Sequence, residues 1–242
     1  MSPAKTIQQF DLPPGRSLGG HYEVVKFLGA GWEGEVYKVA EIQTGIERAA
    51  KIFYPQRNPR GRTLLRYARK LNRLKHVQII IRYHHLDTAK VRGQKVEFMV
   101  SEYVDGEMLA SFIARQPGHR LRSFEALSVL HALASGIAPM HHVGEYHGDI
   151  HSENIMIRRS GIGFMIKLLD FFDLGRPSRE KIQDDVVDLA HILFELIGGR
   201  QRYSKAGPEI RHFVCGLRPS LIARKFKTAG ELKQAIDNLE WP

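Results

Sequence analysis

The feature that most restricts the fold is the order of four short motifs along this 242-residue chain. A glycine-rich octapeptide, residues 29–36, lies between two β-rich runs, and Lys51 lies in the next β-rich run. Far downstream, Asp149 and Asn154 stand five positions apart, and Asp170 follows an apolar, strand-like run. Each motif alone also fits a tight hairpin turn, an exposed lysine or a strand end. Together, and in this order, they form a much stronger signal than any one of them alone, because they combine backbone donors, a cationic side chain and oxygen ligands.

These residue types suit phosphate groups and a hard divalent cation. Glycines at positions 29, 31 and 34 let backbone N–H groups approach phosphate oxygens without a Cβ in the way. Lys51, on the strand after the loop, adds an ammonium group within reach of the same oxygens. The side-chain oxygens of Asn154 and Asp170 are ligands of the kind that Mg²⁺ prefers.

In this order the motifs resemble those of the protein-kinase-like phosphotransferase superfamily, over roughly residues 20–242. The resemblance implies ATP and Mg²⁺ as cofactors and phosphoryl transfer to a hydroxyl group. It assigns catalysis to Asp149, Lys51 and His151, and metal binding to Asn154 and Asp170. The residues that it assigns to the nucleotide are Gly29, Ala30, Gly31, Gly34, Val36, Lys51, Glu102 and Val104.

The resemblance also implies a bilobal α+β fold with a small β-rich N-lobe and a mainly helical C-lobe. We expect a flexible lead-in over residues 1–20, the N-lobe over 21–101, a hinge over 102–106 and the C-lobe over 107–242. In the N-lobe, β-rich runs and apolar spacing predict a helix from Thr63 and strands over 22–28, 35–40, 47–53, 77–83 and 95–101. In the C-lobe, helices are predicted over 123–142, 185–197 and 228–239. Asp185 resembles the aspartate that opens the central kinase helix and braces the catalytic loop.

One residue of the superfamily pattern is missing. The helix after Lys51 should supply a glutamate that pairs with the lysine, at a position near Tyr67, but this helix contains no acidic residue. Lys51 therefore lacks that ion pair or finds another carboxylate. The candidates are Glu33, Glu35 and Asp170. Because phosphoryl transfer depends largely on positioning, the loss favours a weak enzyme or a pseudokinase that acts as a binding module.

The acceptor class is left open by two conflicting resemblances. The N-lobe and residues 102–106 are similar to protein serine/threonine kinases, which is the class we favour. The sequence His147-Gly148-Asp149-Ile150-His151 is more similar to the loop of aminoglycoside, choline and lipopolysaccharide kinases. Phe172 replaces the glycine of the Asp-Phe-Gly motif, and Asp170 and Asp185 are only 15 positions apart, which leaves little room for a peptide-docking platform. A small-molecule kinase is thus the alternative.

Regulation by phosphorylation is not expected. Gly148 replaces the arginine that normally holds a phosphate on the activation segment. Ser178 is the one hydroxyl residue between Phe171 and Asp184, with Arg176 and Arg179 beside it. The sequence therefore predicts constitutive activity.

The distribution of charge suggests a partner. The net charge is +10, and no acidic residue occurs between Glu47 and Asp87, a stretch rich in arginine and lysine. An acidic partner is a candidate ligand for the basic helix at 62–75, while a solvated basic surface is the simpler alternative.

Composition limits the remaining classes. The single cysteine, Cys215, excludes an intramolecular disulfide and favours a reducing, cytoplasmic compartment. No apolar run predicts a signal peptide or a membrane span. Twelve histidines occur without the spacing of a zinc site, and we expect His147 to pack under the catalytic loop.

Overall fold

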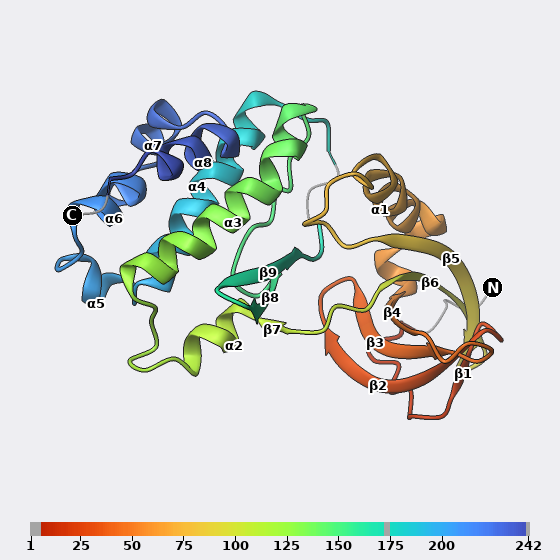
Figure 1. The fold of residues 1–242 in the computed structure, drawn as a ribbon. Coiled ribbons are helices and arrows are strands. Elements are labelled where there is room, and N and C mark those ends of the chain that lie inside the picture. The colour runs from red at the N-terminus through yellow and green to blue at the C-terminus, as the bar shows by residue number, and fades with distance from the viewer. Residues whose placement is uncertain (1–5, 172–174, 241–242) are drawn as a thin grey trace. The chain divides into compact units, whose positions relative to one another are not determined.

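The computed structural model describes residues 6–171 and 175–240, which form two compact units (Figure 1). The first unit combines the chain up to Lys75 with Ile81–Val104. The second combines His76–Ile80 with the chain from Asp105 onward. The division after Val104 falls within residues 102–106, the range expected to form a hinge.

The first unit is built on an antiparallel sheet of strand order β1-β2-β3-β4-β6-β5. Its strands are β1 Ser17–Leu18, β2 Tyr22–Ala30, β3 Gly34–Glu41, β4 Glu47–Phe53, β5 Tyr83–Val91 and β6 Gln94–Glu102. Helix α1, Arg62–Arg73, buries Leu64, Ala68 and Leu71 and packs on β5 and β6. These apolar residues recur at helical spacing, so one face of α1 is buried and the other is solvated.

Residues 1–20 were expected to form a flexible lead-in, but part of this segment is packed on the sheet. Ile7, Phe10 and Leu12 are buried in the same core cluster as the side chains of β2 and β3. The prolines and glycines of this segment suggested mobility, but its apolar side chains have a surface of the sheet to cover. Burial of three such side chains stabilises the segment by several kcal/mol, at about 1.5–3 kcal/mol for each.

The strand expected over residues 77–83 is not present as such, since β5 begins only at Tyr83. Ile79 and Ile80 belong to the second unit, where Ile80 forms an isolated bridge with Leu168 and the N–H of Leu168 donates to the Ile79 carbonyl. The Ile79 side chain packs against Gly136 on α3. A Cβ at position 136 would lie 2.5 Å from Cδ1 of Ile79, so glycine makes room for this side chain. The β-branched run is a buried connection, and its composition alone resembles that of a strand.

The second unit has a three-stranded sheet of order β7-β8-β9 and a group of helices. The strands are β7 Glu107–Met108, β8 Ile155–Ser160 and β9 Gly163–Leu168. The helices are α2 Leu109–Ala114, α3 Ser123–His142, α4 Arg179–Leu196, α5 Arg200–Tyr203, α6 Pro208–Val214, α7 Pro219–Lys225 and α8 Ala229–Asp237. Helix α3 packs against α4, α8 and β9.

The helix predictions in this unit hold for α3 and need one correction for α4. The bounds of α3 are those predicted from its apolar spacing. Helix α4 ends where expected, because Gly198 adopts a φ of 95°, which favours glycine. It begins at Arg179, however, so Asp185 lies well inside the helix and does not open it. Ser178 caps this N-terminus by accepting from the N–H of Lys181.

Within the described ranges, 6–171 and 175–240, no helix combines the length and the apolar character that crossing a membrane requires.

Candidate active site

The glycine-rich loop connects β2 to β3 in the first unit. The N–H of Gly31 donates to the carbonyl of Gly34, which closes the turn. Gly34 is required by packing, since a Cβ would lie 2.0 Å from the carbonyl oxygen of Ile52 on β4. At Gly29 and Gly31 a Cβ would meet nothing within 4 Å, so this side of the loop is open. The loop therefore combines one fixed glycine with two that leave the backbone accessible.

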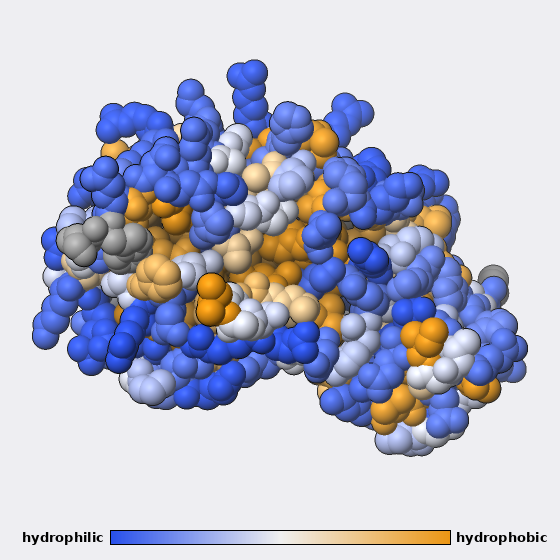
Figure 2. Space-filling view, viewed as in Figure 1, coloured by the Kyte–Doolittle hydropathy of each residue, from blue (hydrophilic) through white to orange (hydrophobic). Residues whose placement is uncertain are grey.

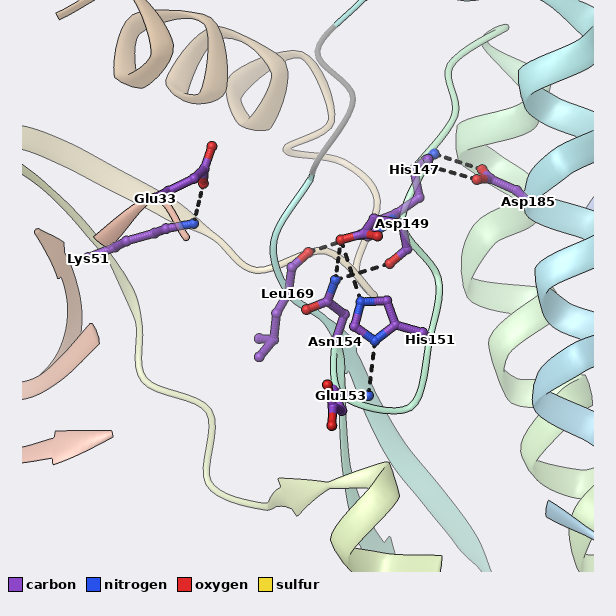
Figure 3. A network of polar contacts seen from close by, with 10 residues as sticks. Glu33, Lys51, His147, Asp149, His151, Glu153, Asn154, Leu169 and Asp185 are labelled. Carbon is purple, nitrogen blue, oxygen red and sulfur yellow. Dashed lines mark hydrogen bonds and ion pairs between the residues drawn. The ribbon is translucent and has the colours of Figure 1, made fainter. Parts of the chain in front are cut away.

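Lys51 is held by a carboxylate of the loop itself (Figure 3). Its ammonium group lies 2.7 Å from Oε2 of Glu33, and the two side chains are 8% and 18% exposed. Glu33 was one of the three carboxylates considered for this lysine, and this pairing is confirmed. Tyr67, at the position where the helix glutamate was expected, is fully buried and has its ring centroid 5.1 Å from the ammonium nitrogen. An aromatic face therefore lies near the cation at the helix position where the glutamate was expected.

Glu35, another of those candidates, belongs to a separate buried network. Its carboxylate accepts hydrogen bonds from the hydroxyls of Tyr37 and Tyr54 and from the N–H of Phe10. Burial and the adjacent carboxylate raise the pKa of Tyr54 to about 12, and they also raise that of Tyr37. Glu35 is therefore satisfied by neutral donors, an arrangement that the sequence did not reveal.

The other residues expected to contact a nucleotide lie along the same sheet. Ala30 ends β2, and Val36 is paired with Lys51 across β3 and β4. Glu102 ends β6, and its carboxylate accepts from the N–H of Arg82. Val104, the last residue of the unit, is half-buried.

In the second unit, Asp149 and Asn154 contact each other directly (Figure 3). The Asn154 amide donates to Oδ2 of Asp149 at 2.6 Å and to the Asp149 carbonyl at 3.2 Å. Nε2 of His151 lies 3.6 Å from the same carboxylate oxygen, while Nδ1 accepts from the N–H of Glu153. In neutral His151 the proton is consequently on Nε2, facing Asp149.

The loop that carries Asp149, His151 and Asn154 is held in place by the carboxylate of Asp185. The Asp185 carboxylate accepts from the backbone N–H groups of His147 and Gly148, both at 2.7 Å, and lies 3.0 Å from Nε2 of His141. Nδ1 of His141 accepts from the N–H of Ala229, so Nε2 carries the proton that is donated to Asp185. The bracing contact expected of Asp185 is thus present, although the residue does not begin its helix.

Asp170 lies next to the Asp149–Asn154 loop. The N–H of Leu169 donates to the Asn154 carbonyl, and Nε2 of His147 contacts the Leu169 carbonyl at 2.9 Å. Phe171 is buried and its ring packs on that of His147, with centroids 4.6 Å apart. His147 therefore packs under the loop as expected, and Phe172 lies outside the described residues.

Asp188, one turn beyond Asp185 on α4, was not singled out from the sequence. Burial, and next the charge of Asp185, raise the pKa of its carboxyl to about 7, while a hydrogen bond from the Ile150 backbone acts in the opposite direction. A group that titrates near neutrality therefore lies against the catalytic loop.

The sequence profile of the protein kinase domain matches residues 22–216. The chain belongs to the protein kinase domain family. Members of this family use ATP and a divalent cation in phosphoryl transfer.

Two curated relatives of this kinase domain are named as serine/threonine kinases. Pkn2 of Myxococcus xanthus is 29% identical over 159 residues, which are 66% of this chain and 19% of the relative. PrkC of Bacillus subtilis is 31% identical over 161 residues, which are 65% of this chain and 23% of the relative. The chain thus spans about a fifth of the length of each of these proteins.

Among solved structures, the kinase domain of PknI from Mycobacterium tuberculosis has the same fold. A double mutant of that domain superimposes with a TM-score of 0.67 and 22% identity, covering 93% of this chain and 98% of the other.

Proposed function

We propose that this kinase domain transfers a phosphoryl group from ATP, with Mg²⁺, to a serine or threonine hydroxyl of a protein. The observation that carries the proposal is the contact between Asp149 and Asn154 on a loop braced by Asp185, with Asp170 next to it. A pseudokinase has no need to keep this set together. The names of the relatives support serine/threonine acceptors.

In this proposal each side chain has a separate task. Asp149 orients the acceptor hydroxyl and takes up its proton, and His151 helps to hold the Asp149 carboxylate at the same oxygen that Asn154 contacts. Asn154 and Asp170 offer oxygen donors of the kind that suit Mg²⁺, which would neutralise phosphate charge when bound. Lys51 and the N–H groups of the glycine-rich loop bind the phosphates, and Val36, Glu102 and Val104 lie near the base.

A small-molecule acceptor is the second candidate. Only residues 171–178 separate Asp170 from the first residue of α4. A segment this short provides little surface for a peptide, whereas a small hydroxyl compound needs none.

The test begins with ATP binding and ends with transfer. ATP should raise the melting temperature by mass action, and more so with Mg²⁺. Radiolabelled phosphate should then move to a serine/threonine peptide in preference to an aminoglycoside. Asp149→Asn should bind ATP and transfer nothing, while Asp170→Asn should lose the effect of Mg²⁺ on ATP binding. ATP binding without transfer to any acceptor would support the pseudokinase instead.

We also propose that α1 binds an acidic peptide segment of a partner protein. Four exposed arginines, at positions 62, 66, 69 and 73, are spaced by four, three and four residues and so form one stripe along the helix. The surface around α1 is largely hydrophilic in Figure 2, viewed as in Figure 1. A stripe of one sign is complementary to a run of carboxylates.

A further inference from the structure

The ion pair of Lys51 involves an unusual partner position. Glu33 lies within the glycine-rich loop, between β2 and β3, and Lys51 lies on β4 of the same sheet. Helix α1, with the sequence RTLLRYARKLNR, has no carboxylate to offer. The Glu33–Lys51 pair therefore joins the glycine-rich loop to β4, and its carboxylate does not come from α1.

A carboxylate on a glycine-rich loop can position a lysine only if the loop itself is fixed. Two contacts hold it, one at the Glu33 backbone and one at the neighbouring Trp32. The N–H of Tyr54, just after β4, donates to the Glu33 carbonyl at 2.9 Å. The guanidinium of Arg57 lies 3.7 Å from the ring centroid of Trp32. The loop tip is thus attached to the segment that follows the strand of Lys51.

Tyr54 is in turn held by the N-terminal segment. Its ring stacks on that of Phe10, with centroids 5.2 Å apart and an interplanar angle of 24°. Its hydroxyl donates to Oε1 of Glu35 at 3.1 Å, the same oxygen that accepts from the N–H of Phe10 at 2.8 Å. The amide of Gln56 donates to the Ile7 carbonyl. A continuous set of contacts therefore runs from Phe10 through Tyr54 to Glu33.

We infer that Glu33 positions Lys51 in place of the missing helix glutamate, and that residues Ile7–Leu12 act through Tyr54 and Glu35 as a strap that fixes Glu33. Loss of the strap lowers activity without removing any group that touches substrate. The inference rests on the proposed function, because it takes Lys51 to be the residue that binds the phosphates. It adds a positioning mechanism in which the N-terminal segment acts on the lysine through Glu33.

The first experiment removes the charge of Glu33. Glu33→Gln should lower kcat/KM for ATP by at least about tenfold. Glu47→Gln is the matched control, since it breaks an equally short pair, with Lys38 at 2.6 Å, on the same sheet. Introducing Tyr67→Glu into Glu33→Gln restores a carboxylate near the ammonium, and should recover part of the lost activity. A merely structural role for Glu33 would give no such rescue, and equal activity of Glu33→Gln and wild type would overturn the inference.

The second experiment tests the strap. Tyr54→Phe removes the hydroxyl bond to Glu35 but keeps the ring on Phe10, and should lower kcat/KM about threefold to tenfold. Tyr22→Phe, whose hydroxyl contacts His85 at 3.3 Å in the same unit, should change it little. In the Glu33→Gln background Tyr54→Phe should have almost no further effect, because both changes act on one interaction. Fully additive losses would contradict the strap.

The third readout needs no activity. A carboxylate favours the charged ammonium form of a lysine, which does not react with an acylating reagent. Mass spectrometry should show faster acylation of Lys51 in Glu33→Gln, a smaller increase in Tyr54→Phe and none in the two controls. An unchanged rate in Glu33→Gln overturns the inference even in an active enzyme. A changed rate in a protein that neither binds ATP nor transfers phosphate means that the pairing is correct and the proposed function is wrong.

Discussion

The buried carboxylate of Asp185 accepts a hydrogen bond from the backbone N–H of His147 at 2.7 Å. Gly148 donates to its second oxygen, and His141 adds a side-chain donor. Helix α4 thereby fixes the start of the loop that carries Asp149 and Asn154, through bonds to the backbone. Such bonds place the loop regardless of which side chains it carries, so Asp185 is a positioning residue for the whole catalytic loop.

Asp185→Asn should therefore be strongly destabilising. An amide has one acceptor oxygen, and its NH₂ group would face an N–H donor in a site that is fully buried. We expect the free energy of unfolding to fall by about 2–4 kcal/mol, with a matching loss of turnover. Asp184→Asn is the control, because Asp184 is exposed, and it should change stability by less than about 0.5 kcal/mol. Denaturant titration of both variants measures the difference, and equal effects would contradict the role of Asp185.

The pH dependence of stability should include a contribution from Asp188. Its pKa is about 7 in the folded state, against a usual value of 3.8, so the folded protein prefers the protonated form. This contribution is fully favourable below about pH 4 and is lost as the pH rises toward 7. Asp188→Asn cannot ionise and keeps an acceptor for the Ile150 N–H. It should be more stable than wild type by about 1–2 kcal/mol at pH 8, a gain that is limited because water partly screens the charge of Asp188 in the wild-type protein. The gain should shrink toward pH 5.

Unfolding titrations at pH 5, 6, 7 and 8 provide the measurement. Wild type and Asp188→Asn should have different slopes of stability against pH. Parallel curves of stability against pH for the two proteins would show that Asp188 ionises normally. The residue would then not be a neutral carboxyl next to the catalytic loop.

The sequence was sufficient for the parts of the site that depend on local spacing. Asp149 and Asn154 lie on one short loop, and a five-residue separation already limits how far apart they can be. The packing of His147 under that loop was expected on other grounds, because no cysteine or carboxylate stands at the spacing of a zinc site. The helix α3 could be predicted to its ends because its apolar residues recur over twenty positions, which leaves the period unambiguous.

The rest depended on contacts between residues far apart in the chain. Phe10 reaches Glu35 and Tyr54 only once β3 and β4 are paired, and nothing near Phe10 in the sequence indicates this. The raised pKa of Asp188 arises from burial against another segment, and the short run 77–81 has the composition of a strand but packs as a connection. In each case the outcome is determined by tertiary packing, which the local sequence does not specify.

Charge reversal on α1 should weaken binding to an acidic peptide. We expect a glutamate-rich peptide to bind wild type with an affinity that falls steeply as salt rises, because the arginine stripe is exposed. Arg66→Glu, Arg69→Glu and Arg73→Glu together should weaken binding by at least about tenfold, measured by fluorescence titration at low salt. The control reverses exposed Arg200, Arg202 and Lys205, which changes the net charge equally. Equal weakening by both triple variants would show a general charge effect and leave α1 as a solvated surface.

Ser178 should matter for stability and not for regulation. Its side chain caps α4 by accepting from the N–H of Lys181 at 3.3 Å, and it is the one hydroxyl between Phe171 and Asp184. Ser178→Ala should cost about 1 kcal/mol of stability through the lost cap. Ser178→Asp keeps a capping oxygen and adds a negative charge near the positive end of the helix dipole, so it should be at least as stable as wild type.

The rates of these two variants decide whether Ser178 is a switch. With Gly148 in place of the arginine that would hold a phosphate, neither variant should change the transfer rate by more than about threefold, or roughly 0.7 kcal/mol of barrier. Phosphatase treatment of the wild-type protein should be equally without effect. A loss of about a hundredfold in Ser178→Ala, recovered in Ser178→Asp, would instead establish phosphorylation at the start of α4 as the control.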